Sequence, residues 1–169
     1  TLLLNHNAFS QTGGIEKVSR VLAKACYEIA EKEGTSFCNF SLYDSQSDSR
    51  YCPESNYKAF GGNKIKFVSA ALKAGRKADK LVLTHINLAL VALLIKLVNP
   101  KIKIFLFAHG IEIWRSLSAW KRYLLFKTHK ILAVSGYTQK RISAKFPRLE
   151  ERSQILNNCL DPLFEVPNN

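Results

Sequence analysis

Residues 101–114, KIKIFLFAHGIEIW, form the stretch that decides the fold class of this chain. Residues 102–108 are an unbroken apolar run of β-branched and aromatic side chains. Such a run indicates a strand buried on both faces, as at the centre of a parallel sheet. It ends in the polar cluster of His109, Gly110 and Glu112. Open α/β sheets bind ligands at the carboxyl ends of their strands, so the cluster is a candidate site. The alternative is that His109 only closes the strand through a hydrogen bond.

Strands and helices alternate along the rest of the chain. After Gly13 and Gly14, apolar residues recur with a helical period, and Gly34 is placed to end that helix. Asn87 and Ser135 are predicted to cap two later helices. The predicted strands cover 2–5, 36–43, 81–85, 102–108, 130–134 and 153–157, and the predicted helices cover 14–34, 65–74, 87–98, 116–127 and 136–145. This order predicts an α/β fold, with a Rossmann-like, mostly parallel sheet and helices on both faces.

Composition places the chain among globular proteins. It has 169 residues, of which 47% are hydrophobic and 22% charged, and this fits one domain with a sizeable core. Its longest uncharged apolar stretch, 81–95, is too short and too polar to cross a membrane. The four cysteines show no CxxC spacing, so we expect no zinc site, no disulfide framework and a reducing, cytoplasmic compartment. They are Cys26, Cys38, Cys52 and Cys159.

The net charge of +12 is unevenly distributed. Residues 57–148 contain 19 Lys and Arg but only two acidic residues, a difference of 17, which predicts an anionic partner. Nucleic acid, a lipid surface and a phosphorylated ligand are the candidates. Lys64–Lys80 and Trp120–Lys127 combine cations with apolar side chains, as interfacial helices do, whereas no nucleic-acid-binding motif is present. Three apolar residues in the first segment are expected to pack on the sheet: Ile65, Val68 and Leu72.

The turn at Gly13-Gly14 lies between the first strand and the first helix. Free backbone N–H groups at a helix start, with no side chains in the way, suit a phosphate group. Neither GxGxxG nor a Walker pattern is present, so a plain tight turn is the alternative.

Four fragments of the chain follow one another in an informative order. They are the Gly13-Gly14 loop, His109-Gly110-x-Glu112-x-Trp114, His129–Ser135 followed by Thr138, and Asn158-Cys159-Leu160-Asp161 followed by Phe164 and Pro167. Together they resemble the amino-terminal half of a glycosyltransferase family 4 enzyme of the GT-B architecture. The resemblance covers essentially the whole chain. One residue departs from the family pattern, because Cys159 stands where the family usually has glycine.

The resemblance implies a retaining transfer of sugar from a nucleotide-sugar to a saccharide or lipid-linked acceptor, with no metal and no other cofactor. Residues 1–157 would be the amino-terminal, acceptor-side domain, and 158–169 the start of an interdomain linker. The carboxyl-terminal donor-binding domain would lie outside this chain, so this half alone is expected to be inactive. Cell-surface polysaccharide or lipopolysaccharide biosynthesis at the inner face of the cell membrane is the implied setting.

The resemblance also implies roles for particular residues. Gly13 and Gly14 would meet the donor diphosphate, and His109 would be catalytic, contacting the transferred sugar. Glu112 and Trp114 would bind the acceptor, although Glu112 can instead pair with Arg115. The alternative to an enzyme is a non-catalytic basic α/β domain that binds nucleic acid or a nucleotide. With no nucleic-acid motif present, that alternative rests on charge alone.

Overall fold

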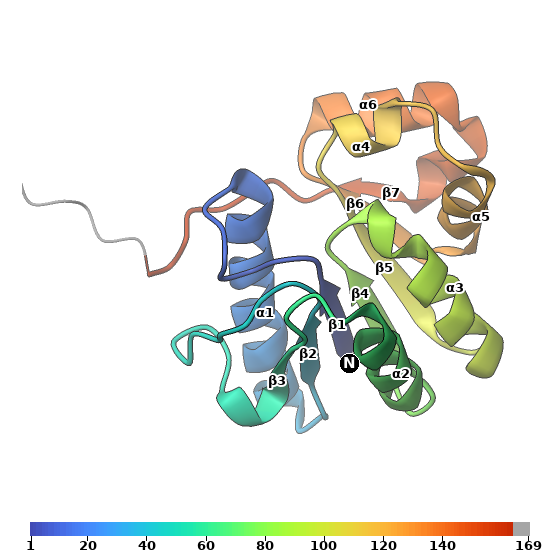
Figure 1. Cartoon of the computed structure of the whole chain (residues 1–169). Helices are drawn as coiled ribbons and strands as arrows, with labels where there is room; N and C mark the ends of the chain where they lie inside the picture. The colour runs from blue at the N-terminus through green and yellow to red at the C-terminus, as the bar shows by residue number, and fades with distance from the viewer. Residues whose placement is uncertain (164–169) are drawn as a thin grey trace, which may run out of the picture.

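The computed structural model describes residues 1–163, which form one seven-stranded sheet (Figure 1). Its order is β3-β2-β1-β4-β5-β6-β7, and every pair of neighbouring strands is parallel. The strands are β1 (Leu2–Asn5), β2 (Cys38–Ser41), β3 (Tyr57–Ala59), β4 (Lys80–Leu83), β5 (Lys103–Ala108), β6 (Lys130–Ala133) and β7 (Ser153–Ile155). The predicted α/β fold is confirmed, and the sheet is parallel throughout.

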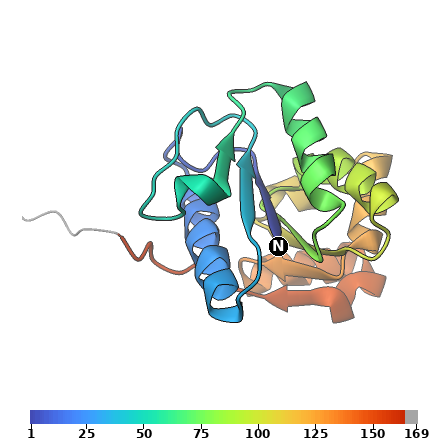
Figure 2. The same cartoon turned by 90° about the horizontal axis from the view of Figure 1, so that it is seen from below.

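Helices cover both faces of the sheet (Figures 1 and 2). They are α1 (Gly14–Glu33), α2 (Lys64–Gly75), α3 (Ala89–Val98), α4 (Ile111–Trp114), α5 (Ala119–Lys127) and α6 (Gly136–Lys145). Strand β1 shows how the two faces are built, because Leu2 and Leu4 enter a large cluster with α2, α3, α5 and α6, whereas Leu3 enters a smaller one with α1. This alternation follows from the period of two in a strand.

The central strand and two helix ends agree with the sequence. In β5, Ile104 and Leu106 are buried in the larger cluster and Phe107 in the smaller one, so this strand is enclosed on both faces. Helix α1 ends at Gly34 in the left-handed conformation, with φ of 63°. Ser135 Oγ accepts a hydrogen bond from Thr138 N at 3.2 Å and caps α6.

The predicted cap at Asn87 is wrong. His85 Nδ1 accepts from Asn87 N at 3.0 Å and caps a short 3₁₀ turn, Ile86–Leu88, and α3 begins only at Ala89. The imidazole nitrogen takes the capping role because His85 has extended backbone directly before the turn.

Other differences concern element bounds. Edge strand β3 was not predicted, because three residues give no period to read. The helix predicted over 116–127 begins later, at residue 119 (α5), and the turn after β5 contains a single helical turn, α4, that was not predicted. Ile65 does not pack on the sheet, since 83% of it is exposed, whereas Val68 and Leu72 do pack there. Two further 3₁₀ turns, Glu54–Asn56 and Pro147–Arg152, complete the structure.

Beyond β7 the chain turns toward α1 (Figure 1). Asp161 accepts a hydrogen bond from Tyr51 OH at 2.6 Å and lies 3.9 Å from Arg20 Nε. Phe164 and Pro167, which contributed to the family resemblance, lie outside the described residues. Within residues 1–163, no helix is long and apolar enough to cross a membrane.

Candidate functional site

Three of the four histidines gather where neighbouring strands end, which we call the carboxyl edge. His6 follows β1, His85 lies two residues beyond β4, and His109 follows β5. The rings of His6 and His85 stack, with centroids 5.2 Å apart and planes inclined by 23°. Parallel strands end at the same edge, so β1, β4 and β5 bring together residues that are far apart in sequence.

The ring of His109 is fixed by a backbone group of the neighbouring strand connection. Its Nε2 lies 2.8 Å from the carbonyl oxygen of Thr84. A carbonyl oxygen only accepts, so Nε2 carries the proton in this contact. In the part of the chain that the structure describes, Nδ1 has no hydrogen-bond partner. The half-buried imidazole therefore presents a free lone pair at the carboxyl edge.

Burial keeps two of the imidazoles neutral at neutral pH. It lowers the pKa of His6 to about 4, with help from the positive charges that His85 and Lys121 can carry. Burial also lowers the pKa of His85, an effect that the negative charge of Glu112 opposes. The edge beside His109 is thus lined by uncharged rings that can exchange hydrogen bonds with hydroxyl groups.

Glu112 holds the turn that follows His109. Its Oε1 accepts from His109 N at 2.6 Å and from Gly110 N at 3.1 Å. Within residues 1–163 it forms no ion pair with Arg115, and Oε2 has no partner. Glu112 thus shapes the turn first, and acceptor binding through Oε2 stays a prediction.

Gly110 and Trp114 pack against each other in the same turn. Gly110 has φ of 145°, a conformation that L side chains rarely adopt, and a Cβ there would lie 3.0 Å from the Trp114 ring. That ring also meets Tyr137 edge-on, with centroids 5.1 Å apart. The Trp114 indole N–H is buried and has no partner within residues 1–163. These contacts give Trp114 a packing role, and its predicted part in acceptor binding stays untested.

Gly13 and Gly14 stand at the start of α1, as the sequence predicts. Gly13 precedes the helix in an extended conformation without a side-chain cap, and a Cβ at Gly14 would have open space around it. Among the described residues, the N–H groups of residues 14–16 have no hydrogen-bond partner. The Glu16 carboxylate lies over Gly13, where a Cβ would be. An anion at this helix start must therefore displace the Glu16 side chain.

A buried carboxylate, Asp44, organises the loop between β1 and α1. Its oxygens accept from the consecutive amides of residues 8–10, at 2.7 Å for Ala8, 3.2 Å for Phe9 and 2.9 Å for Ser10. Three hydroxyl groups also donate to Asp44: Ser10 Oγ, Ser41 Oγ and Tyr57 OH. Burial alone would raise the pKa of Asp44, but the hydrogen bonds from Ser10, Tyr57 and Ser41 outweigh burial and lower it.

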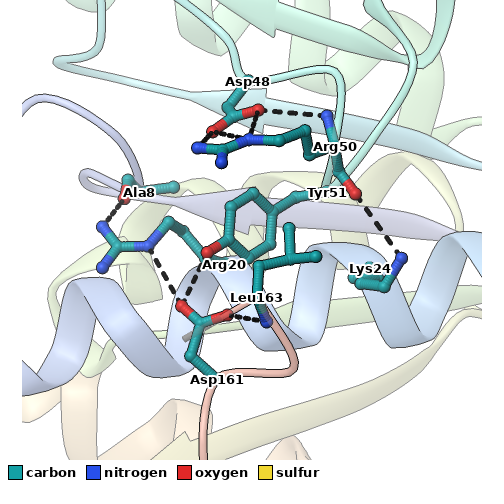
Figure 3. Close-up of polar contacts among 8 residues, drawn as sticks. All are labelled: Ala8, Arg20, Lys24, Asp48, Arg50, Tyr51, Asp161 and Leu163. Atoms are coloured by element: carbon teal, nitrogen blue, oxygen red, sulfur yellow. Dashed lines mark hydrogen bonds and ion pairs between the residues drawn. The ribbon is translucent and has the colours of Figure 1, made fainter. Parts of the chain in front are cut away.

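A polar cavity of about 420 Å³ opens beside this loop. It lies between loop residues 9–12, the side chain of Arg20 and segment 45–51. Figure 3 shows how Arg20 joins these parts, with Nη1 donating to Ala8 O at 2.8 Å and Nε facing Asp161. Arg50 is paired with Asp48, at 2.7 Å between Nη2 and Oδ2. Arg20 thus ties the loop before Gly13 to the segment that follows β7.

The fold is shared with Anabaena HepE. The structure of HepE in complex with UDP and glucose matches with a TM-score of 0.58 and 12% sequence identity, over 93% of this chain and 44% of the HepE chain. The structure of HepE with UDP-glucose gives 0.57 and 13%, over 93% and 43%. No protein-family model and no curated protein matches the chain. At this identity the likeness to HepE shows the fold, and the chain spans less than half the length of HepE.

The sequence-predicted residues fall into two groups on the structure. His109, Glu112 and Trp114 share one turn at the end of β5, whereas Gly13 and Gly14 start α1, the helix that follows β1. The strands behind both groups, β1 and β5, each pair with β4, and both groups lie at the carboxyl edge.

Sequence reasoning missed His6, His85 and Asp44. For the histidines a signal was available, because each follows an apolar run, as His109 does. Among residues 1–163 no group of three or more His, Cys, Asp or Glu side chains is placed to hold a metal ion.

Proposed function

We propose that this chain is the acceptor-side domain of a glycosyltransferase that moves a sugar from a nucleotide-sugar to a saccharide or lipid-linked acceptor. One observation carries the proposal: the carboxyl edge combines a fixed His109 ring that has an unengaged Nδ1 with a helix start that has unengaged N–H groups. The fold shared with HepE, which was solved with UDP-glucose, supports the same class of donor.

The start of α1 is the proposed contact for the donor diphosphate. The N–H groups of residues 14–16 and the positive end of the helix dipole both favour an anion. Gly14 leaves room for close approach, and Glu16, a flexible side chain, swings aside to admit the phosphates. This helix start offsets diphosphate charge, so the proposal includes no metal ion and no other cofactor.

His109 is the proposed catalytic residue. With Nε2–H committed to Thr84 O, Nδ1 accepts a hydrogen bond from a hydroxyl of the transferred sugar and fixes its position. The bond between the anomeric carbon and the diphosphate oxygen breaks, and positive charge develops on the sugar ring. The hydrogen bond to Nδ1 makes that hydroxyl oxygen more electron-rich, and because the His109 ring is already fixed, it stabilises this charge without reorganisation. In a retaining transfer the acceptor oxygen bonds to the anomeric carbon on the face that the phosphate leaves, and its proton passes to the departing phosphate.

The rest of the machinery is proposed to come from a carboxyl-terminal domain beyond residue 169. We propose that the segment around Asp161, which Tyr51 and Arg20 hold beside α1, leads toward that domain. We propose a hexosyl transfer in cell-surface polysaccharide or lipopolysaccharide biosynthesis, on the cytoplasmic side of the membrane. Glu112 Oε2 is the group that we propose for an acceptor hydroxyl.

The test is a transfer assay on the protein that includes the sequence following residue 169 in its gene. Radiolabelled UDP-sugars are supplied with a membrane extract as the source of acceptor. We expect transfer by the longer protein and none by the 169-residue chain. A longer protein that folds, yet neither transfers nor hydrolyses any nucleotide-sugar, would contradict the proposal.

A further inference from the structure

Helices α2, α3 and α5 lie side by side on one face of the sheet, with α3 packed between the other two (Figure 1). We call their solvent side the α2–α3–α5 face. Together these helices contain seven Lys and Arg residues and no Asp or Glu. Within residues 1–163 none of these cations forms an ion pair. These helices therefore carry seven of the 19 cations in residues 57–148, and no acidic side chain of the three helices compensates them.

Large apolar side chains stand among these cations. Seven of them are between 40% and 83% exposed: Ile65, Leu90, Leu97, Val98, Trp120, Tyr123 and Phe126. On α5, Trp120, Tyr123 and Phe126 follow a spacing of three and share one side of the helix. Lys127 Nζ lies 5.1 Å from the centre of the Tyr123 ring. Exposed apolar groups on three neighbouring helices mark a surface that is covered in use.

The chemistry of this surface favours a lipid bilayer over nucleic acid. Proteins bind single-stranded nucleic acid through cations and through aromatic rings that stack on the bases. The exposed aliphatic side chains of Ile65, Leu90 and Leu97 provide neither of these contacts. A bilayer takes all three components, since anionic headgroups attract Lys and Arg, aliphatic side chains enter the acyl boundary, and Trp and Tyr prefer the headgroup level.

The face also adjoins the candidate site. All three helices start at the carboxyl edge, and in the first turn of α5 Lys121 Nζ donates to Asn87 Oδ1 at 2.5 Å, two residues from His85. A membrane against this face would lie next to the histidines.

We propose that the α2–α3–α5 face docks on an anionic lipid surface as a peripheral membrane contact. This inference stands on the charge and exposure of the face and does not require the proposed transferase activity. If the activity is also present, docking brings a lipid-linked acceptor to the carboxyl edge.

Co-sedimentation with vesicles tests the proposal on the 169-residue chain. Neutral phosphatidylcholine vesicles are compared with vesicles containing phosphatidylglycerol, at about 0.1 M and 1 M salt, where the Debye length is about 10 Å and 3 Å. We expect binding to the anionic vesicles only, and a steep loss at high salt. Trp120 and Trp114 are the two tryptophans, so a blue shift of emission that disappears in Trp120→Phe reports insertion of this face.

Matched variants locate the contact. Replacing Lys121, Arg122 and Lys127 with Ser should weaken binding to anionic vesicles about 100-fold. The control replaces three exposed lysines elsewhere, Lys17, Lys32 and Lys140, and should weaken it far less. Circular dichroism checks that both variants fold.

Four results would overturn the proposal: equal binding to neutral and anionic vesicles, no binding to either, equal losses in the two triple variants, or salt-sensitive binding to oligonucleotides without binding to vesicles. Self-association that the first triple variant abolishes, without vesicle binding, would instead assign the face to a second copy of the chain.

Discussion

Two loops at the carboxyl edge are held by carboxylates that accept hydrogen bonds from consecutive backbone N–H groups. Asp44 holds residues 8–10 before the Gly-Gly turn, and Glu112 holds residues 109–110 at the end of β5. Asp44 is fully buried, comes from a different connection and receives three hydroxyl groups as well. Glu112 is half-buried, belongs to the turn that it holds and uses one oxygen.

This difference indicates how strongly hydrogen bonds fix the conformation of each loop. The loop before α1 is held by Asp44, a buried carboxylate from another connection, and a loop held in this way fits the phosphate contact that we propose at Gly13 and Gly14. The turn after β5 is held locally, so Glu112 can release an amide or engage a ligand at little cost. We therefore expect substitution of Asp44 to lower the free energy of unfolding, and substitution of His109 to lower the proposed transferase activity.

Asp44→Ala is expected to have the largest effect, a loss of about 3 kcal/mol or more in the free energy of unfolding. It would leave several buried donors unsatisfied, at roughly 1–3 kcal/mol each. Urea unfolding measures the loss. Asp48→Ala is the matched control, because within residues 1–163 the hydrogen bonds of this half-buried carboxylate all come from Arg50, an exposed partner, and its loss should cost about 1 kcal/mol or less. Equal losses in the two variants would remove Asp44 as the anchor of the loop.

His109→Ala should lower kcat about 100-fold in the longer protein, if one is active, because a group that stabilises transition-state charge is removed. Its free energy of unfolding should change little. His129→Ala is the control, since this histidine precedes β6 at the opposite end of the sheet and should keep full activity. Near-normal turnover in His109→Ala would show that His109 has only a structural role, namely the hydrogen bond from the end of β5 to Thr84 O.

Acidification should destabilise the domain through His6. Its pKa is about 4 when folded against 6.5 when unfolded, so between these values the unfolded chain binds a proton that the folded chain does not. Stability therefore falls as pH drops from 6.5 toward 4, by on the order of 1 kcal/mol per pH unit. Unfolding curves of His6→Gln across this range should show a shallower slope, and His85, whose pKa burial also lowers, should account for the slope that is left. If the pH dependence of the free energy of unfolding is the same in the variant, titratable groups other than His6 cause it.

The contribution of the Asp44 carboxylate to stability changes at a lower pH than that of His6. Its folded pKa is lowered below 3.8, so its contribution is present above that pH and is lost as pH falls further.

Glu112→Gln should have the smallest effect, about 1 kcal/mol or less, because its amide oxygen can still accept from His109 N and Gly110 N. In the longer protein the same variant should raise KM for the acceptor more than it lowers kcat, if Oε2 binds an acceptor hydroxyl. A loss of stability as large as that of Asp44→Ala would erase the contrast between the two loops.

The sequence predicts local features of this molecule well. The buried β5 run, the helix end at Gly34 and the Ser135 cap each depend on a few neighbouring residues, and each is confirmed. The Asn87 prediction fails although the rule was local, because residues 86–88 form a 3₁₀ turn that His85 caps, and α3 begins only at Ala89. Strand β3 fails because three residues on a sheet edge carry no pattern.

Long-range contacts are what the sequence hides. Asp44 lies in a loop rich in Ser and Asp, and its sequence neighbours do not distinguish it from the half-buried Asp48. Its partners at residues 8–10 are more than 30 positions away. The stacking of His6 on His85 likewise depends on β1 and β4 being adjacent, an order that nothing in either segment encodes.

The central claim is that the carboxyl edge contacts a nucleotide-sugar, and amide chemical shifts of the ¹⁵N-labelled longer protein, which includes the proposed donor-binding domain, test it most directly. UDP-glucose is titrated to millimolar concentration, with glucose alone as the control. The account predicts shifts concentrated on the amides of residues 13–16 and His109, and absent from residues 119–127. Shifts confined to the α2–α3–α5 face, or no shifts at all, would contradict it.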